Sequence, residues 1–81
     1  MILVGRKATM HYVLGAMTQI NNGAETIEFK ARGNAITRMV NAVNVITNIM
    51  FPDWDIEDIQ MRYEHIEGNT FTTNLSIVIS A

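Results

Sequence analysis

The stretch that decides the fold is Glu28-Phe29-Lys30-Ala31-Arg32-Gly33-Asn34-Ala35-Ile36-Thr37-Arg38. Up to Ala31, polar and apolar side chains alternate, which is the period of a half-buried strand. Gly33 then permits a sharp turn, and Asn34 is a residue type that caps helix N-termini. The stretch therefore predicts a strand, a tight turn and the start of a helix.

Basic side chains gather around this predicted turn. Lys30, Arg32 and Arg38 flank the helix N-terminus, where unpaired N–H groups and the helix dipole favour an anion. Two interpretations are open at this point. The cations hold a phosphate group, or they are ordinary solvated surface charges.

Length and composition indicate one small domain spanning residues 1–81. The hydrophobic fraction, 48%, is more than a core of this size needs, which predicts a second buried surface and most simply a homodimer. The absence of cysteine excludes disulfides and thiolate chemistry. The apolar run at residues 1–4 is too short for a signal peptide or a membrane span, so we expect a cytoplasmic protein that does not bind membranes.

The formal net charge of −2 hides an asymmetry along the chain. Residues 1–50 carry five cations and two anions, a balance of +3, whereas residues 51–81 carry one cation and six anions, a balance of −5. The total excludes a strongly basic protein, while the distribution is compatible with a locally basic surface.

Apolar spacing and turn signals predict six elements. They are a strand at 1–5, a helix at 8–20, strands at 25–31 and 55–66, a longer helix at 34–50 and a strand at 70–80. Asn21-Asn22-Gly23 ends the first helix, Pro52 ends the second, and Glu67-Gly68-Asn69-Thr70 forms a hairpin turn. The order β-α-β-α-β-β predicts an α+β fold, a two-layer sandwich with a four-stranded mixed sheet and both helices on one face.

This order also predicts where the cations lie. Right-handed crossovers bring both strand-to-helix turns to the same edge of the sheet. Arg6-Lys7 and Arg32-Gly33-Asn34 would therefore meet, and five of the six basic side chains would lie in or near these turns. Because the cations are predicted to lie close together, a phosphate site is favoured over ordinary solvated surface charges.

Three motifs occur in order along the chain. They are Gly5-Arg6-Lys7 followed by Met10-His11-Tyr12-Val13-Leu14, Lys30-Ala31-Arg32-Gly33 followed by Ala35-Ile36, and Phe51-Pro52 at the end of the second helix. With these motifs and this order of elements, essentially the whole chain resembles the Alba family of archaeal chromatin and RNA-binding proteins.

The resemblance implies a small, chromosome-associated homodimer, joined through the second helix and the later strands. It implies a fold like that of the C-terminal domain of bacterial translation initiation factor three, and binding of double-stranded DNA, RNA or both through phosphates. With the charge pattern, it assigns nucleic-acid contacts to Arg6, Lys7, Lys30, Arg32, Asn34 and Arg38. Lys7 matches a position that is acetylated in some relatives.

Several positions depart from the family pattern. Asn34 replaces a basic residue, and we expect it to cap its helix, with a contact to a base or ribose as the alternative. Thr47 and Ile49 replace arginines, and the hairpin carries the acids Glu64 and Glu67. Because each missing phosphate contact weakens binding, we expect a lower affinity than that of typical relatives and hairpin arms that phosphate repels.

Other functions are weighed against this one. A protein-interaction module that has largely lost nucleic-acid binding is the alternative, with the apolar second helix contacting a partner. We expect no enzymatic activity, because His11 and His65 have no carboxylate or nucleophile at useful spacing.

An acidic cluster follows the second helix, at Asp53, Asp55, Glu57 and Asp58. It lacks the glycine and the later glutamate of a calcium loop, so we expect a solvated turn and neither metal nor cofactor. Trp54, within the cluster, is expected to anchor the core or the dimer interface.

Overall fold

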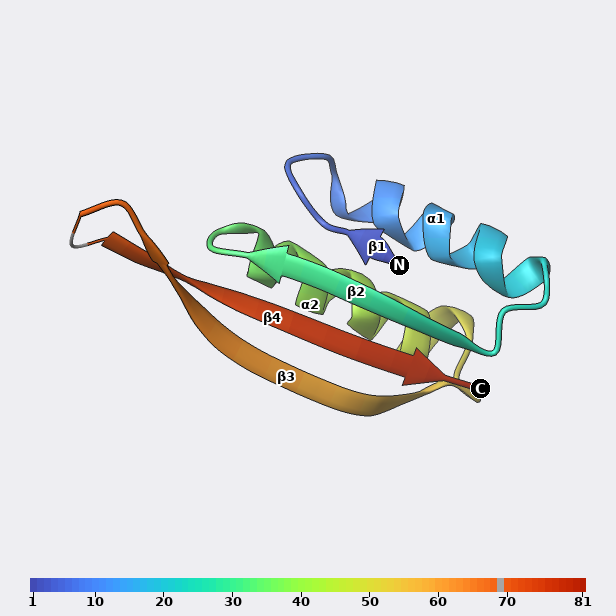
Figure 1. Ribbon diagram of the computed structural model, residues 1–81. Coiled ribbons are helices and arrows are strands. Elements are labelled where there is room, and N and C mark those ends of the chain that lie inside the picture. Colours follow the sequence, from blue (N-terminus) through green and yellow to red (C-terminus); the bar gives the residue numbers. More distant parts are fainter. Residues whose placement is uncertain (69) are drawn as a thin grey trace.

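The computed structural model describes residues 1–68 and 70–81. The helices are α1 (Thr9–Asn21) and α2 (Ala35–Val45), and a π-helical turn, η1 (Ile46–Met50), continues α2 (Figure 1). The strands are β1 (Ile2–Leu3), β2 (Thr26–Arg32), β3 (Asp55–Ile66) and β4 (Thr70–Ser80). The predicted order is confirmed, with a shorter first strand. The predicted hairpin turn includes Asn69, which lies outside the described residues.

The four strands form one mixed sheet in the order β1-β2-β4-β3. β1 runs parallel to β2, whereas β4 runs antiparallel to both of its neighbours. Both helices lie on one face of the sheet and leave the other face open (Figure 1). The α+β sandwich expected from the sequence is thus confirmed.

Local sequence explains how the helices end. Gly23 adopts a positive φ of 97°, its N–H donates to the Ile20 carbonyl at 3.0 Å, and the Ala24 N–H donates to the Gln19 carbonyl at 3.0 Å. These two bonds form a Schellman motif, as the asparagine–glycine signal predicts. The second helix reaches Met50 as expected, but its last turn is π-helical.

The core lies between the helices and the inner face of the sheet. β2 alternates as predicted and buries Ile27, Phe29 and Ala31. Opposite it, α1 buries Val13 and Ala16, and α2 with η1 buries Met39, Ala42, Val43 and Ile46. Trp54 is buried in the same cluster, so it anchors the core of the single chain.

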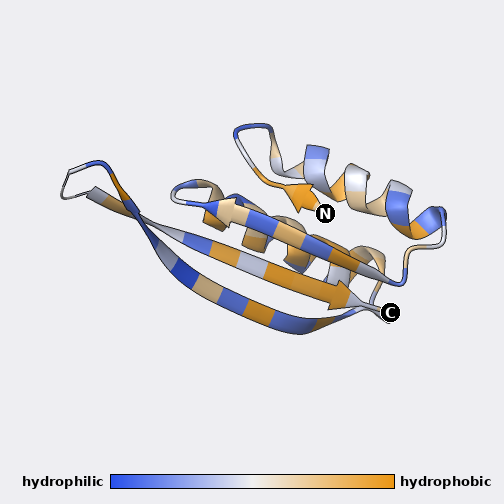
Figure 2. Cartoon of the chain, viewed as in Figure 1, coloured by the Kyte–Doolittle hydropathy of each residue, from blue (hydrophilic) through white to orange (hydrophobic). Residues whose placement is uncertain are grey.

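β3 is exposed along its whole length although it alternates in hydropathy (Figure 2). Ile59 pairs with buried Ile77, and Met61 pairs with Leu75, so both point toward the helix side of the sheet. The helices cover β2 and β4 more than this edge strand, which leaves the Met61 side chain 74% exposed. Within residues 1–68 and 70–81, no helix is long and apolar enough to span a membrane.

Candidate nucleic-acid interface

The two strand-to-helix turns meet at one end of the sheet (Figure 1). We call residues 4–8 and 33–34 the paired turns. Arg38, in the first turns of α2, donates a hydrogen bond from its guanidinium to the Gly5 carbonyl. The Val4 N–H donates to the Lys30 carbonyl at 2.8 Å, which joins the start of the first turn to β2. The crossover rule therefore placed the turns correctly.

Tyr12 holds the first of these turns in shape. Its hydroxyl oxygen accepts hydrogen bonds from the Gly5 N–H at 2.8 Å and from the Lys7 N–H at 3.1 Å. The side chain is 7% exposed, so the bonds form at the edge of the core. Tyr12 was not among the residues predicted to act at this site, although a polar-tipped aromatic on the buried face of the first helix signals such a role.

Both helix N-termini lack a competing anion or cap. In the described part of the chain, neither α1 nor α2 has a side-chain capping bond or an acid in its first turn. The prediction that Asn34 caps its helix is wrong, because the residue occupies the N-cap position with helical angles (φ −66°, ψ −15°) and makes no such bond there. The His11 and Ile36 N–H groups donate to the Ala8 and Gly33 carbonyls, and the other first N–H groups of the two helices remain able to bind an anion.

The predicted basic residues are near one another but do not share one face. Arg6 and Lys7 are exposed on the first turn, and Arg38 is half-buried between the turns. Lys30 and Arg32 alternate with the buried residues of β2, so they point to the open face of the sheet. The set therefore wraps around one end of the molecule.

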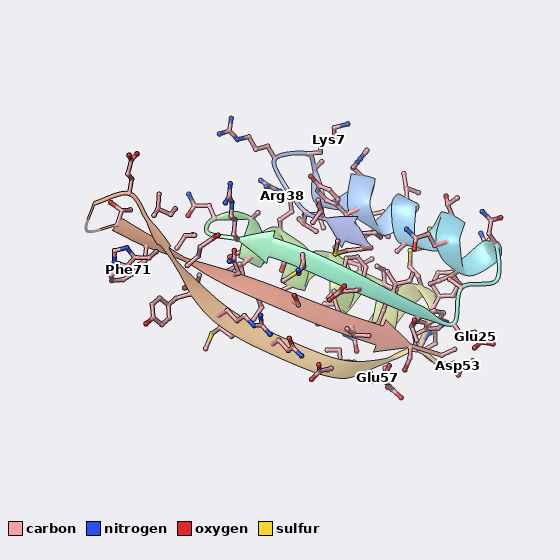
Figure 3. The ribbon with its side chains drawn as sticks, viewed as in Figure 1. Lys7, Glu25, Arg38, Asp53, Glu57 and Phe71 are labelled. Atoms are coloured by element: carbon pink, nitrogen blue, oxygen red, sulfur yellow. The ribbon has the colours of Figure 1, made fainter. Side chains whose placement is uncertain are left out.

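The labelled charges lie at two ends of the molecule. Lys7 and Arg38 lie at the end formed by the paired turns, whereas Glu25, Asp53 and Glu57 lie at the opposite end (Figure 3). The asymmetry along the sequence is thus only partly an asymmetry in space, because Glu64 and Glu67 lie on the hairpin, and Glu64 is close to Arg32.

Arg32 already has a carboxylate partner. Its guanidinium lies 3.8 Å from the Glu64 carboxylate of β3, and the two side chains are 70% and 53% exposed. The Asn74 amide also donates to Glu64, at 3.3 Å. A phosphate that binds Arg32 has to compete with this carboxylate, which sequence reasoning placed only at the end of the hairpin.

Gly33 sets the geometry of the second turn. Its φ of +57° lies in the left-handed region, and its N–H donates to the Thr73 carbonyl at 3.0 Å. A Cβ there would lie 3.3 Å from the Thr72 hydroxyl. Glycine thus lets the turn lie tightly against β4.

Comparison with known proteins identifies relatives of this chain. A sequence model of the family described as Alba matches residues 1–60. "DNA/RNA-binding protein Alba 1" of Archaeoglobus fulgidus is 39% identical over 95% of this chain and 86% of its own length. This chain belongs to the Alba family. "DNA/RNA-binding protein Alba" of Methanocella arvoryzae is 43% identical over 80% of this chain and 68% of its own length.

A solved Alba structure also superposes on the chain. "Alba from Thermoplasma volcanium" matches with a TM-score of 0.91 at 35% identity, over 99% of this chain and 98% of that one. The structural similarity therefore includes the β3–β4 hairpin, which continues past residue 60, where the match to the family model ends.

The acidic cluster of this Alba-family chain is dispersed. Among residues 1–68 and 70–81, no three His, Asp or Glu side chains are grouped to hold a metal ion. Glu57 forms a bulge between the paired positions Ile56 and Asp58.

Proposed function

We propose that this protein binds DNA, RNA or both by holding phosphates at the paired turns. The observation that carries the proposal is the hydrogen bond from Arg38 to the Gly5 carbonyl, which joins the two turns. The first turn, which carries Arg6 and Lys7, thereby lies beside the second turn, which follows Arg32. The printed names of the relatives, DNA/RNA-binding protein, support the same function.

The residues at this end have different parts in the proposal. Arg6, Lys7 and Arg32 contact phosphates, and Lys30 contacts them from the open face. Arg38 mainly positions the first turn, since its guanidinium is already donating there. The amide of Asn34 is available for a base or ribose, because it does not cap its helix. These contacts give affinity and position with little sequence readout.

We also propose a homodimer. Ile59 and Met61 expose an apolar edge on the helix side of β3, and Ile49 at the end of the second helix is 73% exposed. A second copy that covers these residues removes apolar surface from water and places two sets of paired turns on one molecule. Two sets double the number of phosphate contacts.

The affinity in this proposal is lower than that of typical relatives. Glu64 competes for Arg32, and Glu67 adds negative charge near the end of the hairpin. The protein associates with the chromosome through the same phosphate contacts. Acetylation of exposed Lys7 would remove one of the cations and weaken binding further.

Fluorescence anisotropy with matched duplex DNA and RNA over a salt series tests the proposal. We expect the Arg6→Ala/Lys7→Ala pair and Arg32→Ala each to weaken binding and to flatten the log–log salt slope by about 0.9 for each phosphate that the variant no longer neutralises. Asn22→Asp, at the far end of α1, lowers the net charge without touching the turns and should behave as wild type.

Two results would overturn the phosphate site. One is the absence of wild-type binding at about 50 mM salt. The other is wild-type affinity in the turn variants. Either result makes the protein-interaction module, acting through the apolar second helix, the leading function.

A further inference from the structure

The open face of the sheet carries a groove that extends beyond the paired turns. Its volume is about 570 Å³, and its lining residues come from all four strands, with the polar ones on the side of the sheet away from the helices. Its lining includes three cations and three neutral polar side chains: Lys30, Arg32, Arg62, Gln60, Asn74 and Ser76. Glu28 is the one acid among the described residues that line it, which gives the lining a formal charge of +2, while the Glu64 carboxylate beside the groove pairs with Arg32.

The strand register arranges these side chains in two rows. Lys30, Ser76 and Gln60 form one row across the three strands, and Arg32, Asn74 and Arg62 form the next. Adjacent rows on one face of a sheet are separated by roughly 7 Å, and outer strands of three by roughly 10 Å. Cations therefore occupy three of the four outer positions around the central Ser76 and Asn74 side chains, and Gln60 occupies the fourth.

Much of the binding capacity of these groups is unused. Within residues 1–68 and 70–81, the side chains of Lys30 and Arg62 make no hydrogen bond or ion pair. The amide groups of Gln60 and Asn74 donate to Asp58 and Glu64, which leaves the amide oxygens as acceptors. Such oxygens accept from base amino groups and from the ribose 2′-hydroxyl.

We propose that this groove binds a single-stranded segment of nucleic acid. Lys30 and Arg62 contact its phosphates, and Gln60, Asn74 and Ser76 bond to its bases or sugars. Its polar side chains span roughly 7 Å by 10 Å, an area that suits a nucleotide-sized group better than the wider face of a duplex. The described lining residues include no aromatic side chain, so binding relies on charge and hydrogen bonds.

The groove is continuous with the paired turns. Arg32 is the last residue of β2, immediately before Gly33, and it also lines the groove. A single strand of nucleic acid that is bound at the paired turns can therefore continue into the groove on the open face of the sheet. The inference rests on the proposed function for this continuity, but Arg62 lies on β3 and belongs to the groove only.

Arg62→Ala tests the groove by anisotropy with two probes, a short oligouridine and a duplex of matched length. We expect about tenfold weaker binding of the oligouridine, as for removal of a charged hydrogen bond. Its salt slope should flatten by about 0.7, the value for one phosphate contact to a single strand. Binding of the duplex should stay at the wild-type level, and oligothymidine of the same length shows whether the ribose hydroxyl contributes.

Controls separate this inference from the proposed function. Asn22→Asp changes the net charge as Arg62→Ala does and should leave both probes unaffected. Ser76→Asp, which puts a negative charge at the centre of the groove, should repeat the loss for the oligouridine. Circular dichroism melting checks that each variant is folded.

The outcomes distinguish the two sites. Wild-type oligouridine affinity in Arg62→Ala, or an equal loss for both probes, overturns the groove as a single-strand site. An effect of Arg62→Ala on oligouridine alone supports the groove even if the Arg6→Ala/Lys7→Ala pair leaves duplex binding unchanged, a result that overturns the paired turns instead.

Discussion

At the residue scale, Tyr12 links the core to the binding end. The hydroxyl satisfies two backbone N–H groups of the turn that carries Arg6 and Lys7. A turn held in one conformation loses less conformational entropy when it binds a phosphate than a mobile turn does. Tyr12 is therefore a positioning residue for the proposed interface.

Tyr12→Phe should lower the free energy of unfolding by about 1 kcal/mol, the usual contribution of a hydrogen bond, and should also weaken binding of duplex. Urea unfolding and anisotropy measure the two effects. Tyr63→Phe is the matched control, since Tyr63 is exposed on β3. Unchanged duplex binding by folded Tyr12→Phe would show that the turn does not need this hydroxyl.

Glu64 is the second residue whose effect can be isolated. Glu64→Gln removes the carboxylate beside Arg32 and should tighten duplex binding by about two- to fivefold, the range of an exposed ion pair. Glu67→Gln makes the same charge change beyond the end of β3 and should have a smaller effect. Equal gains for the two variants in anisotropy would mean that only net charge matters.

At the scale of elements, glycines have opposite roles in the second turn and the first helix. Gly33 has a φ of +57° and lies tightly against β4, whereas a Cβ at Gly15 would meet no described atom within 4 Å. The backbone conformation decides the sign of a substitution at each position.

Gly33→Ala should destabilise the protein by about 1–2 kcal/mol, the cost of a left-handed L-residue. Gly15→Ala should stabilise it by about 0.5–1 kcal/mol, because alanine is favoured inside a helix. Thermal and urea unfolding give both values. A stabilising Gly33→Ala would mean that the turn relaxes out of the left-handed region.

At the scale of the whole molecule, the exposed apolar edge of β3 is the main feature that one chain leaves unexplained. Met61 and Ile59 face the helix side yet remain exposed. Burial of such surface contributes about 25 cal/mol per Å², which is the driving force for the proposed association of two copies.

Sedimentation should therefore show a dimer at micromolar concentration, and Met61→Glu should shift it to a monomer. Gln60→Glu introduces the same charge on the open face of the same strand and should leave the dimer intact. A monomeric wild-type protein would contradict the proposed dimer.

The sequence alone predicts the elements, their order and the α+β fold, because burial periodicity and turn chemistry depend on residues close together in the chain. The alternation of β2 and the glycine signal after α1 predicted structure that is observed. The crossover rule even brought Arg6-Lys7 to the second turn, since the handedness of such connections is nearly invariant.

Tertiary structure decided what these residues touch. The bond from Arg38 to the Gly5 carbonyl, the pairing of Arg32 with Glu64 and the open-face position of Arg62 each join residues distant in sequence. No local pattern encodes such contacts, because they depend on strand register and on how the elements pack. For the same reason Asn34, a good cap by residue type, does not cap the helix that it precedes.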